Sequence, residues 1–302
     1  MTDVRPLVVA SLLLFIGCTV GLAELPGDGP HPPDAGPGDD AGAAADAGIT
    51  PDGGEGSDAG SPDSGTPVPD AGPPDAGPPS HASCTQAADL KGATDRTAAG
   101  NPYTAYVPAT YDPMRPAALV VALHGAGDTA QNYLQFMWRA NADARGFIVI
   151  APQGTYPYMG GFAWYGSDDA LVVAAMNDVQ KCYSVDPKRI LLNGFSAGGS
   201  MAYFIGLSQA QLFSGMAIQS SSLSAGEYVA GGALLPAPWK VPVSHFHGES
   251  DPNFVLADAL SGINRLQAAG HPVFWHPFVG GHQATAADAL VEFDELKGFI
   301  AP

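Results

Sequence analysis

From residue 81 onward, short apolar runs alternate with longer amphipathic segments. The runs are rich in branched and aromatic residues and predict strands, whereas apolar positions three and four residues apart predict helices. Strands are expected at residues 104–111, 117–124, 147–152, 189–195, 214–220, 241–247 and 272–279. Helices are expected at residues 129–145, 169–183, 198–209, 254–268 and 285–299. This alternation predicts one α/β domain over residues 81–302, with a mostly parallel, doubly wound sheet.

Residues 19–80 show neither pattern and are rich in Pro, Gly, Asp and Ala. Within them, residues 24–80 hold 12 acidic residues and no Lys or Arg. A segment of this composition has too little apolar surface to bury a core, so we expect a disordered linker. Asp-Ala-Gly recurs in it, but a calcium-binding interpretation is disfavoured because the spacing fits no EF-hand loop.

Residues 1–18 read as an export signal. The apolar run at residues 7–17 is too short to span a bilayer as a helix, and it ends at Cys18 in a way that resembles a bacterial lipobox. We predict that Cys18 is lipidated and anchors the chain in the cell envelope, as an outer-membrane lipoprotein because no aspartate follows at Thr19. The alternative is cleavage after Ala23, which would release an extracellular protein.

The net charge of the predicted domain limits the partners and substrates that it can bind. The formal net charge is −18, but the linker carries most of it, and residues 81–302 have a net charge of about −6. This balance argues against a nucleic-acid partner and against strongly anionic substrates.

Cys84 and Cys182 are the two cysteines that remain besides Cys18. In an oxidising compartment they are expected to form a disulfide; two buried free thiols are the alternative.

A glycine-flanked serine joins a predicted strand to a predicted helix. Residues 194–199 read Gly-Phe-Ser-Ala-Gly-Gly, the Gly-x-Ser-x-Gly pattern of a sharp strand-to-helix turn. Such a turn strains the serine backbone and exposes its hydroxyl, and the helix N-terminus directs unpaired N–H groups toward it. We therefore predict that Ser196 is a nucleophile; an ordinary glycine-rich turn is the alternative.

A nucleophilic serine needs a base, and the base needs an orienting acid. Asp251 and His282 each follow a predicted strand, at the edge where α/β active sites form. The chain order Ser196, Asp251, His282 is that of α/β-hydrolase triads. Glu249 is the alternative acid, and Asp251 is favoured because Asp-Pro commonly starts a turn.

The base must be chosen among eight histidines. His282 is preferred because it alone follows a Gly-Gly turn after the last strand. His245 and His247 alternate within a predicted strand and are expected to be structural or to line the rim. His271 and His276 flank or lie in the last strand and are not expected to catalyse.

Backbone N–H groups are expected to stabilise an oxyanion. One belongs to Ala197, the residue after the nucleophile. The other is assigned to Ala126, because residues 124–127 form a His-Gly-x-Gly loop after the first strongly apolar strand. An ordinary strand-end turn is the alternative. His124 is expected to orient this loop without transferring protons.

With these pieces in place, residues 103–300 resemble the polyhydroxybutyrate depolymerase-like and feruloyl esterase-like secreted serine esterases. The resemblance implies an α/β-hydrolase fold, a Ser-Asp-His triad, carboxylic-ester hydrolysis and no metal or other cofactor. Two segments differ from many relatives, residues 253–255 after the acid and 283–285 after the base, and these positions are expected to help shape the acyl or alcohol pocket. The matching segments are residues 119–127, 186–190, 194–199, 247–252 and 280–282.

An aromatic loop after residue 151 is the candidate substrate site. Tyr158, Trp164 and Tyr165 are expected to line the pocket, although they would equally serve to cover the loop's own small core. Residues 221–240 form the only sizeable insertion, so any lid is expected to be small. We expect small soluble acetyl or hydroxycinnamoyl esters as substrates. A polyhydroxybutyrate depolymerase, a serine peptidase and a catalytically silent surface-binding module are the alternatives.

Overall fold

The computed structural model describes residues 83–84 and 88–302. The predicted export signal with Cys18, and the predicted linker over residues 19–80, lie outside the described residues. In the described part of the chain, no helix is long and apolar enough to cross a bilayer.

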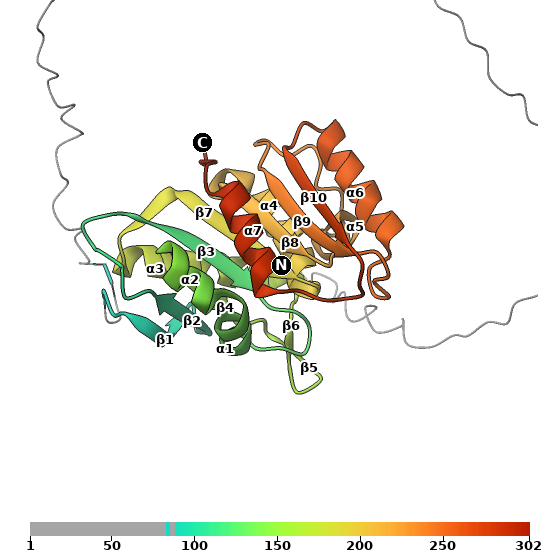
Figure 1. Ribbon diagram of the computed structural model, residues 1–302. Coiled ribbons are helices and arrows are strands. Elements are labelled where there is room, and N and C mark those ends of the chain that lie inside the picture. The colour runs from blue at the N-terminus through green and yellow to red at the C-terminus, as the bar shows by residue number, and fades with distance from the viewer. Residues whose placement is uncertain (1–82, 85–87) are drawn as a thin grey trace, which may run out of the picture. The chain divides into compact units, whose positions relative to one another are not determined.

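Within the described residues, eight strands form one sheet in the order β1-β2-β4-β3-β7-β8-β9-β10 (Figure 1). Strands β1 and β2 are antiparallel to their neighbours, and all pairs from β4 to β10 are parallel. The strand bounds are β1 Gly92–Ala98, β2 Asn101–Val107, β3 Ala117–Leu123, β4 Ile148–Pro152, β7 Val185–Phe195, β8 Gly215–Gln219, β9 Val243–Gly248 and β10 Val273–Phe278. A small antiparallel hairpin, β5 Tyr156–Tyr158 with β6 Gly161–Ala163, stands apart from this sheet.

Helices cover both faces of the sheet, because successive residues of each buried strand point to opposite sides. Leu119, Val121 and Leu123 of β3 pack in an apolar core on one face of the sheet. Val120 and Ala122 pack in a second core on the other face. The first core takes α3 Asp169–Cys182, α4 Ala197–Ser208, α5 Leu223–Ala230 and α6 Leu256–Ala268; the second takes α1 Ala130–Tyr133, the π-helical turn Leu134–Trp138, α2 Arg139–Arg145 and α7 Ala286–Leu296. The predicted doubly wound α/β fold is confirmed.

Local details differ from the sequence-based expectations. The strand expected at 104–111 is β2, which ends earlier because Tyr111 belongs to a turn onto Pro108. The helix expected at 129–145 is interrupted by the π-helical turn. Strand β1 was not predicted, because it is an edge strand with exposed polar side chains. The expected insertion at 221–240 contains α5, whose N-cap is Ser222.

A disulfide joins Cys84 to Cys182 at the end of α3. It ties the start of the described domain to the layer that covers β1 and β2. Beside it, Asp178 accepts a hydrogen bond of 2.6 Å from Tyr103 and lies 3.4 Å from the guanidinium of Arg96. These contacts fix the antiparallel end of the sheet.

Candidate active site

Ser196 lies on a tight turn between β7 and α4, near the centre of the sheet. Its backbone has φ 55° and ψ −121°, a conformation that costs a non-glycine residue energy. The turn needs glycine on both sides: a Cβ at Gly194 would overlap the backbone of Gly198, and a Cβ at Gly198 would overlap the carbonyl of Leu123. The N–H of Ser196 donates to the Gln219 carbonyl at 3.0 Å. The turn that carries Ser196 is therefore in contact with β3 and β8, the two strands that flank β7.

The structure brings Ser196, His282 and Asp251 into one hydrogen-bonded line. Ser196 Oγ is 2.9 Å from His282 Nε2, and His282 Nδ1 is 2.8 Å from Asp251 Oδ2. The Asp251 side chain is fully buried, and 16% of the His282 side chain is exposed. The other carboxylate oxygen, Asp251 Oδ1, accepts from the N–H groups of Asn253 and Phe254 at 2.8 and 3.0 Å. This geometry is the one that activates a serine hydroxyl.

The other candidates for acid and base lie elsewhere. Glu249 is exposed, and its backbone is held by the Phe278 carbonyl. His276 pairs with Glu295 at 3.0 Å on the surface of α7, and His271 contacts the Val241 carbonyl at the amino end of β10.

Two phenylalanines contact the His282 ring. The sequence analysis did not assign Phe195 to the site, and it expected Phe254 only to help shape the pocket. The ring centroid of Phe195 is 5.0 Å from that of His282, and the Phe254 ring stacks on the same imidazole, with centroids 5.7 Å apart and an interplanar angle of 21°. Phe195 is the second residue of the Gly-x-Ser-x-Gly pattern and Phe254 follows the acid by three residues, so their positions in those motifs were the available signal.

The loop of residues 124–127 passes directly beside Ser196. A Cβ added at Gly125 would be 2.9 Å from the Phe195 ring and 3.6 Å from Ser196 Cβ. Among the described residues, the N–H groups of Ala126 and Ala197 have no backbone acceptor. Both are thus free to donate to an oxygen bound in front of Ser196.

The side chain of His124 joins this loop to the segment at Gly154 through hydrogen bonds. It is buried, and burial lowers the pKa of its imidazole. Its Nδ1 donates to the Gly125 carbonyl at 2.8 Å, while Nε2 accepts from the N–H of Gly154 at 3.1 Å. A neutral ring satisfies both contacts.

The aromatic loop is joined to the same segment. The N–H of Gly127 donates to the Phe162 carbonyl, and the N–H of Phe162 donates to the Asp128 carbonyl, both at 2.9 Å. Trp164 Nε1 donates to the His124 carbonyl at 2.8 Å, and its ring lies 4.8 Å from the His124 ring. Half-buried Trp164 therefore supports the loop of residues 124–127 directly.

The tyrosines of the aromatic loop are more open. Tyr165 is exposed and makes an edge contact with Tyr156 at 5.0 Å, and half-buried Tyr158 stacks on Tyr156. Exposed Met159 lies at the hairpin tip next to Gly127.

A buried carboxyl group is linked to Ser196 through Gln219. Glu292 of α7 accepts a hydrogen bond of 2.8 Å from Gln219 Nε2, and the carbonyl of that glutamine holds the N–H of Ser196. Burial raises the pKa of Glu292 well above its ordinary value, so the group is neutral in the folded protein near its ordinary pKa.

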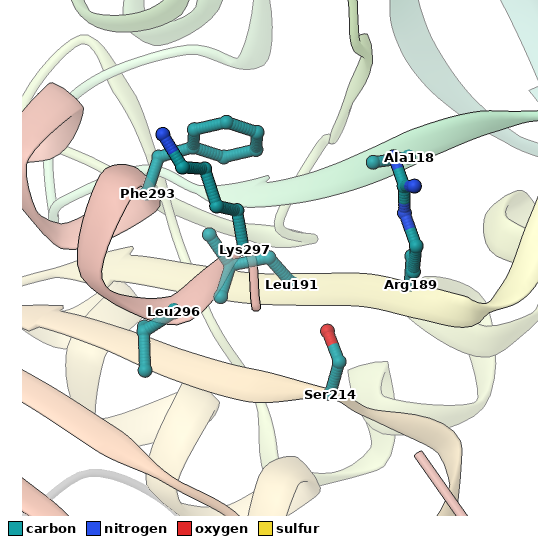
Figure 2. Close-up of a pocket in the computed structure, with 7 residues that line it drawn as sticks. All are labelled: Ala118, Arg189, Leu191, Ser214, Phe293, Leu296 and Lys297. Atoms are coloured by element: carbon teal, nitrogen blue, oxygen red, sulfur yellow. The ribbon is translucent and has the colours of Figure 1, made fainter. Parts of the chain in front are cut away.

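Two cavities lie away from these residues, at the amino ends of the parallel strands. The one in Figure 2 has a volume of about 20 Å³ and lies between α7 and the first halves of β3 and β7. A larger groove of about 400 Å³ adjoins it, with Arg115, Arg145 and Arg189 at its rim. Neither contributes a residue to the line of Ser196, His282 and Asp251. In the part of the chain that the structure describes, no three His, Cys, Asp or Glu side chains are grouped as a metal site would need.

Comparison with known proteins points to esterases. A bifunctional acetylxylan esterase/xylanase of Neocallimastix patriciarum is 33% identical over 158 residues, covering 51% of this chain and 22% of that protein. A probable feruloyl esterase C of Aspergillus niger is 29% identical over 187 residues, covering 56% and 64%. A poly(3-hydroxyalkanoate) depolymerase C of Paucimonas lemoignei is 33% identical over 111 residues, covering 33% and 27%. The chain thus spans between about a fifth and two thirds of the length of these relatives.

Solved structures share the fold. A fluorophosphonate-binding serine hydrolase of Staphylococcus aureus superposes with a TM-score of 0.51 at 14% identity, covering 67% of this chain and 95% of that one. A thermostable esterase superposes with a TM-score of 0.50 at 18% identity, covering 69% and 62%. Residues 108–286 match the phospholipase/carboxylesterase family. Since that match covers more than half of its residues and the sheet is that of the solved structures, the chain belongs to this family and has the α/β-hydrolase fold.

Proposed function

We propose that this protein hydrolyses carboxylic esters through a covalent acyl-enzyme, with Ser196 as nucleophile, His282 as base and Asp251 as orienting acid. The observation that carries the proposal is the unbroken line of two hydrogen bonds, 2.9 and 2.8 Å long, that joins these three side chains. The line ends on the strained turn of Ser196, whose hydroxyl faces the carboxyl edge of the sheet.

In the acylation step, Ser196 Oγ attacks the ester carbonyl carbon while its proton passes to His282 Nε2. The carbonyl π electrons move to the oxygen, and the N–H groups of Ala126 and Ala197 stabilise that oxyanion. Each such donor is worth roughly 10²–10³ in rate. Collapse of the tetrahedral intermediate breaks the bond to the alcohol oxygen, which takes the proton from His282. Asp251 keeps Nδ1–H in place and stabilises the imidazolium.

Deacylation repeats the sequence with water. His282 removes a proton from water as the oxygen attacks the acyl carbon, and the second intermediate releases the acid when Ser196 Oγ leaves and regains the proton. The two phenylalanines in contact with the imidazole limit its rotation between the two steps.

We propose small soluble acetyl or hydroxycinnamoyl esters as substrates. Similarity to the acetylxylan esterase/xylanase and to the feruloyl esterases supports these acyl groups. Exposed Tyr165, on the loop joined to residues 124–127, offers an aromatic face for a phenolic ring or a sugar.

Polyhydroxybutyrate hydrolysis is the second candidate, because exposed apolar side chains lie near triad residues in the sequence or beside the loop of residues 124–127. Val279 is 93% exposed three residues before His282, Val255 follows Phe254, and Met159 is 81% exposed beside the oxyanion loop. Such side chains suit a flat apolar polymer, and similarity to the poly(3-hydroxyalkanoate) depolymerase supports this alternative.

An ester panel decides between these substrates, and a labelling experiment tests the chemistry. Purified protein should react with a fluorophosphonate probe and turn over acetyl and feruloyl esters faster than it clears a polyhydroxybutyrate suspension. Ser196→Ala should abolish both labelling and turnover with an unchanged melting temperature. Wild-type protein that is inert to the probe would support a silent binding module. Faster amide than ester turnover would indicate a peptidase, and faster clearing of the polymer would indicate a depolymerase.

The location of the protein is also part of the proposal. We infer export and anchoring through a lipid on Cys18, from the short apolar run that ends at this residue and the long acidic segment after it. Release into the medium after cleavage at Ala23 is the alternative.

A further inference from the structure

A buried chain of hydrogen bonds runs from the core to the loop that carries Asp251. It starts at Tyr203 of α4, whose hydroxyl is 2.9 Å from His245 Nδ1. His245 Nε2 is 3.3 Å from His247 Nδ1, and His247 Nε2 is 2.8 Å from the Phe254 carbonyl oxygen. Both histidines belong to β9, which lies beside β10 in the sheet (Figure 1).

The protons of this chain can be assigned from its last member. A carbonyl oxygen only accepts, so His247 Nε2 must carry a hydrogen. In a neutral ring His247 Nδ1 then accepts, which requires a hydrogen on His245 Nε2. His245 Nδ1 in turn accepts from the Tyr203 hydroxyl. All three hydrogen bonds therefore point the same way, with each group donating to the next from Tyr203 to the Phe254 carbonyl.

The surroundings keep both rings neutral. His245 and His247 are buried, and burial lowers the pKa of each imidazole. Trp275 of β10 packs against both, with ring centroids 5.1 and 5.9 Å away. If His247 were protonated, its Nδ1–H would donate to His245 Nε2, and His245 Nδ1–H would donate to the Tyr203 oxygen. The Tyr203 hydroxyl hydrogen would then have no acceptor among these hydrogen bonds, and a buried unpaired donor is costly.

The segment at the end of the chain contacts His282 twice. Asp251 accepts the imidazole Nδ1–H, and the Phe254 ring stacks on the imidazole. The segment is closed at one end by Asp251 Oδ1, which binds the N–H groups of Asn253 and Phe254. Its other end is held by His247 at the Phe254 carbonyl. Movement of that carbonyl would therefore shift both contacts to the base.

We propose that His247 is a positioning residue for the catalytic histidine, acting through the Phe254 carbonyl at the end of the Tyr203–His245–His247 chain. The inference rests on the proposed function, because it assumes that His282 is the base. It assigns a catalytic consequence to two histidines that otherwise look like ordinary core residues.

Two substitutions of His247 separate positioning from packing. Gln places an amide N–H where His247 Nε2 lies and keeps the bond to Phe254; Asn reaches only the position of Nδ1 and loses that bond. We expect His247→Asn to lower kcat for an acetyl ester by about 10- to 100-fold with a smaller change in KM, since small misplacements of catalytic groups have effects of this size. His247→Gln should stay within about 3-fold of the wild type. Both variants should lower the melting temperature, because each breaks one bond of the chain.

Equal activity of the two variants, whether high or low, would overturn the proposal, as would a more active Asn variant. His271→Asn and His271→Gln are matched controls, because His271 is also buried and bound to a carbonyl but lies at the far end of β10. They should change the melting temperature and leave kcat unchanged.

Nitrogen NMR of the wild-type protein tests the chain without any variant. At pH 7, His245 and His247 should both be neutral with the hydrogen on Nε2. A hydrogen on Nδ1 of His247, or a charged ring, would refute the proton assignment and with it the proposal. Fluorophosphonate labelling of the same sample tests the proposed function separately, because it depends on Ser196 reactivity and is independent of the tautomers.

Discussion

Replacing Glu292 with glutamine should stabilise the protein increasingly as the pH rises. Glu292 is fully buried, and burial is the main cause that raises the pKa of its carboxyl group well above 4.5. Among the described residues, Glu292 Oε1 and Gln219 Oε1 have no hydrogen-bond partner, so the site has a place for one further donor. The protonated carboxyl group supplies that donor only while it remains neutral. Glutamine supplies it at every pH and has nearly the same shape.

The magnitude follows from proton linkage. Below pH 4.5 the carboxyl group is neutral in both the folded and the unfolded chain, and its contribution to stability is fully present. Above that value the unfolded chain releases the proton while the folded protein retains it. The wild type then loses about 1.4 kcal/mol of stability per pH unit, until the pH reaches the raised folded pKa. Glu292→Gln lacks this loss, so its advantage over the wild type should grow at that rate above about pH 5.

Denaturant unfolding of both proteins from pH 4 to pH 8, with the disulfide intact, measures this difference directly. All other groups titrate in both proteins, so their effects cancel in the comparison. Glu249→Gln is the matched control: it makes the same chemical change at an exposed position and should give no comparable gain. A stability difference that stays constant between pH 5 and pH 8, or that increasingly favours the wild type, would refute the reasoning.

Four further predictions follow from the site and the sequence. The kcat/KM should fall at acid pH because the base must be neutral; a profile flat down to about pH 4 would exclude His282 as base. Cys84→Ser should cost about 2–4 kcal/mol of unfolding free energy, measured in denaturant, whereas no loss would mean that the disulfide does not form in solution. Trp164→Ala should lower kcat for acetyl and feruloyl esters alike, because its indole holds the His124 carbonyl; a selective rise in KM for the feruloyl ester would instead indicate contact with substrate. Cys18→Ala should move the enzyme from the membrane fraction of a bacterial host to the soluble fraction, and unchanged partitioning would contradict lipid anchoring.

The sequence by itself determined the fold class and the sharp strand-to-helix turn that carries Ser196. Both depend on short-range patterns: alternating strand and helix periodicities, and glycines where strand and helix approach too closely for a side chain. Gly194 and Gly198 were readable in this way because their reason is local. The order of Ser196, Asp251 and His282 added the expected triad, since such residues follow strands at one edge of a parallel sheet.

Only the tertiary structure decided between groups that lie close together in sequence. Asp251 reaches His282 whereas Glu249, two residues earlier, faces solvent, because the turn after β9 directs the two side chains differently. The contact of Trp164 with the His124 carbonyl and that of Glu292 with Gln219 join segments 40 and 73 residues apart. Their partners follow from the packing of strands and helices that are distant in the chain. A buried neutral carboxyl group and a directed histidine chain are therefore properties of the assembled core, because each exists only where several segments exclude water from the same place.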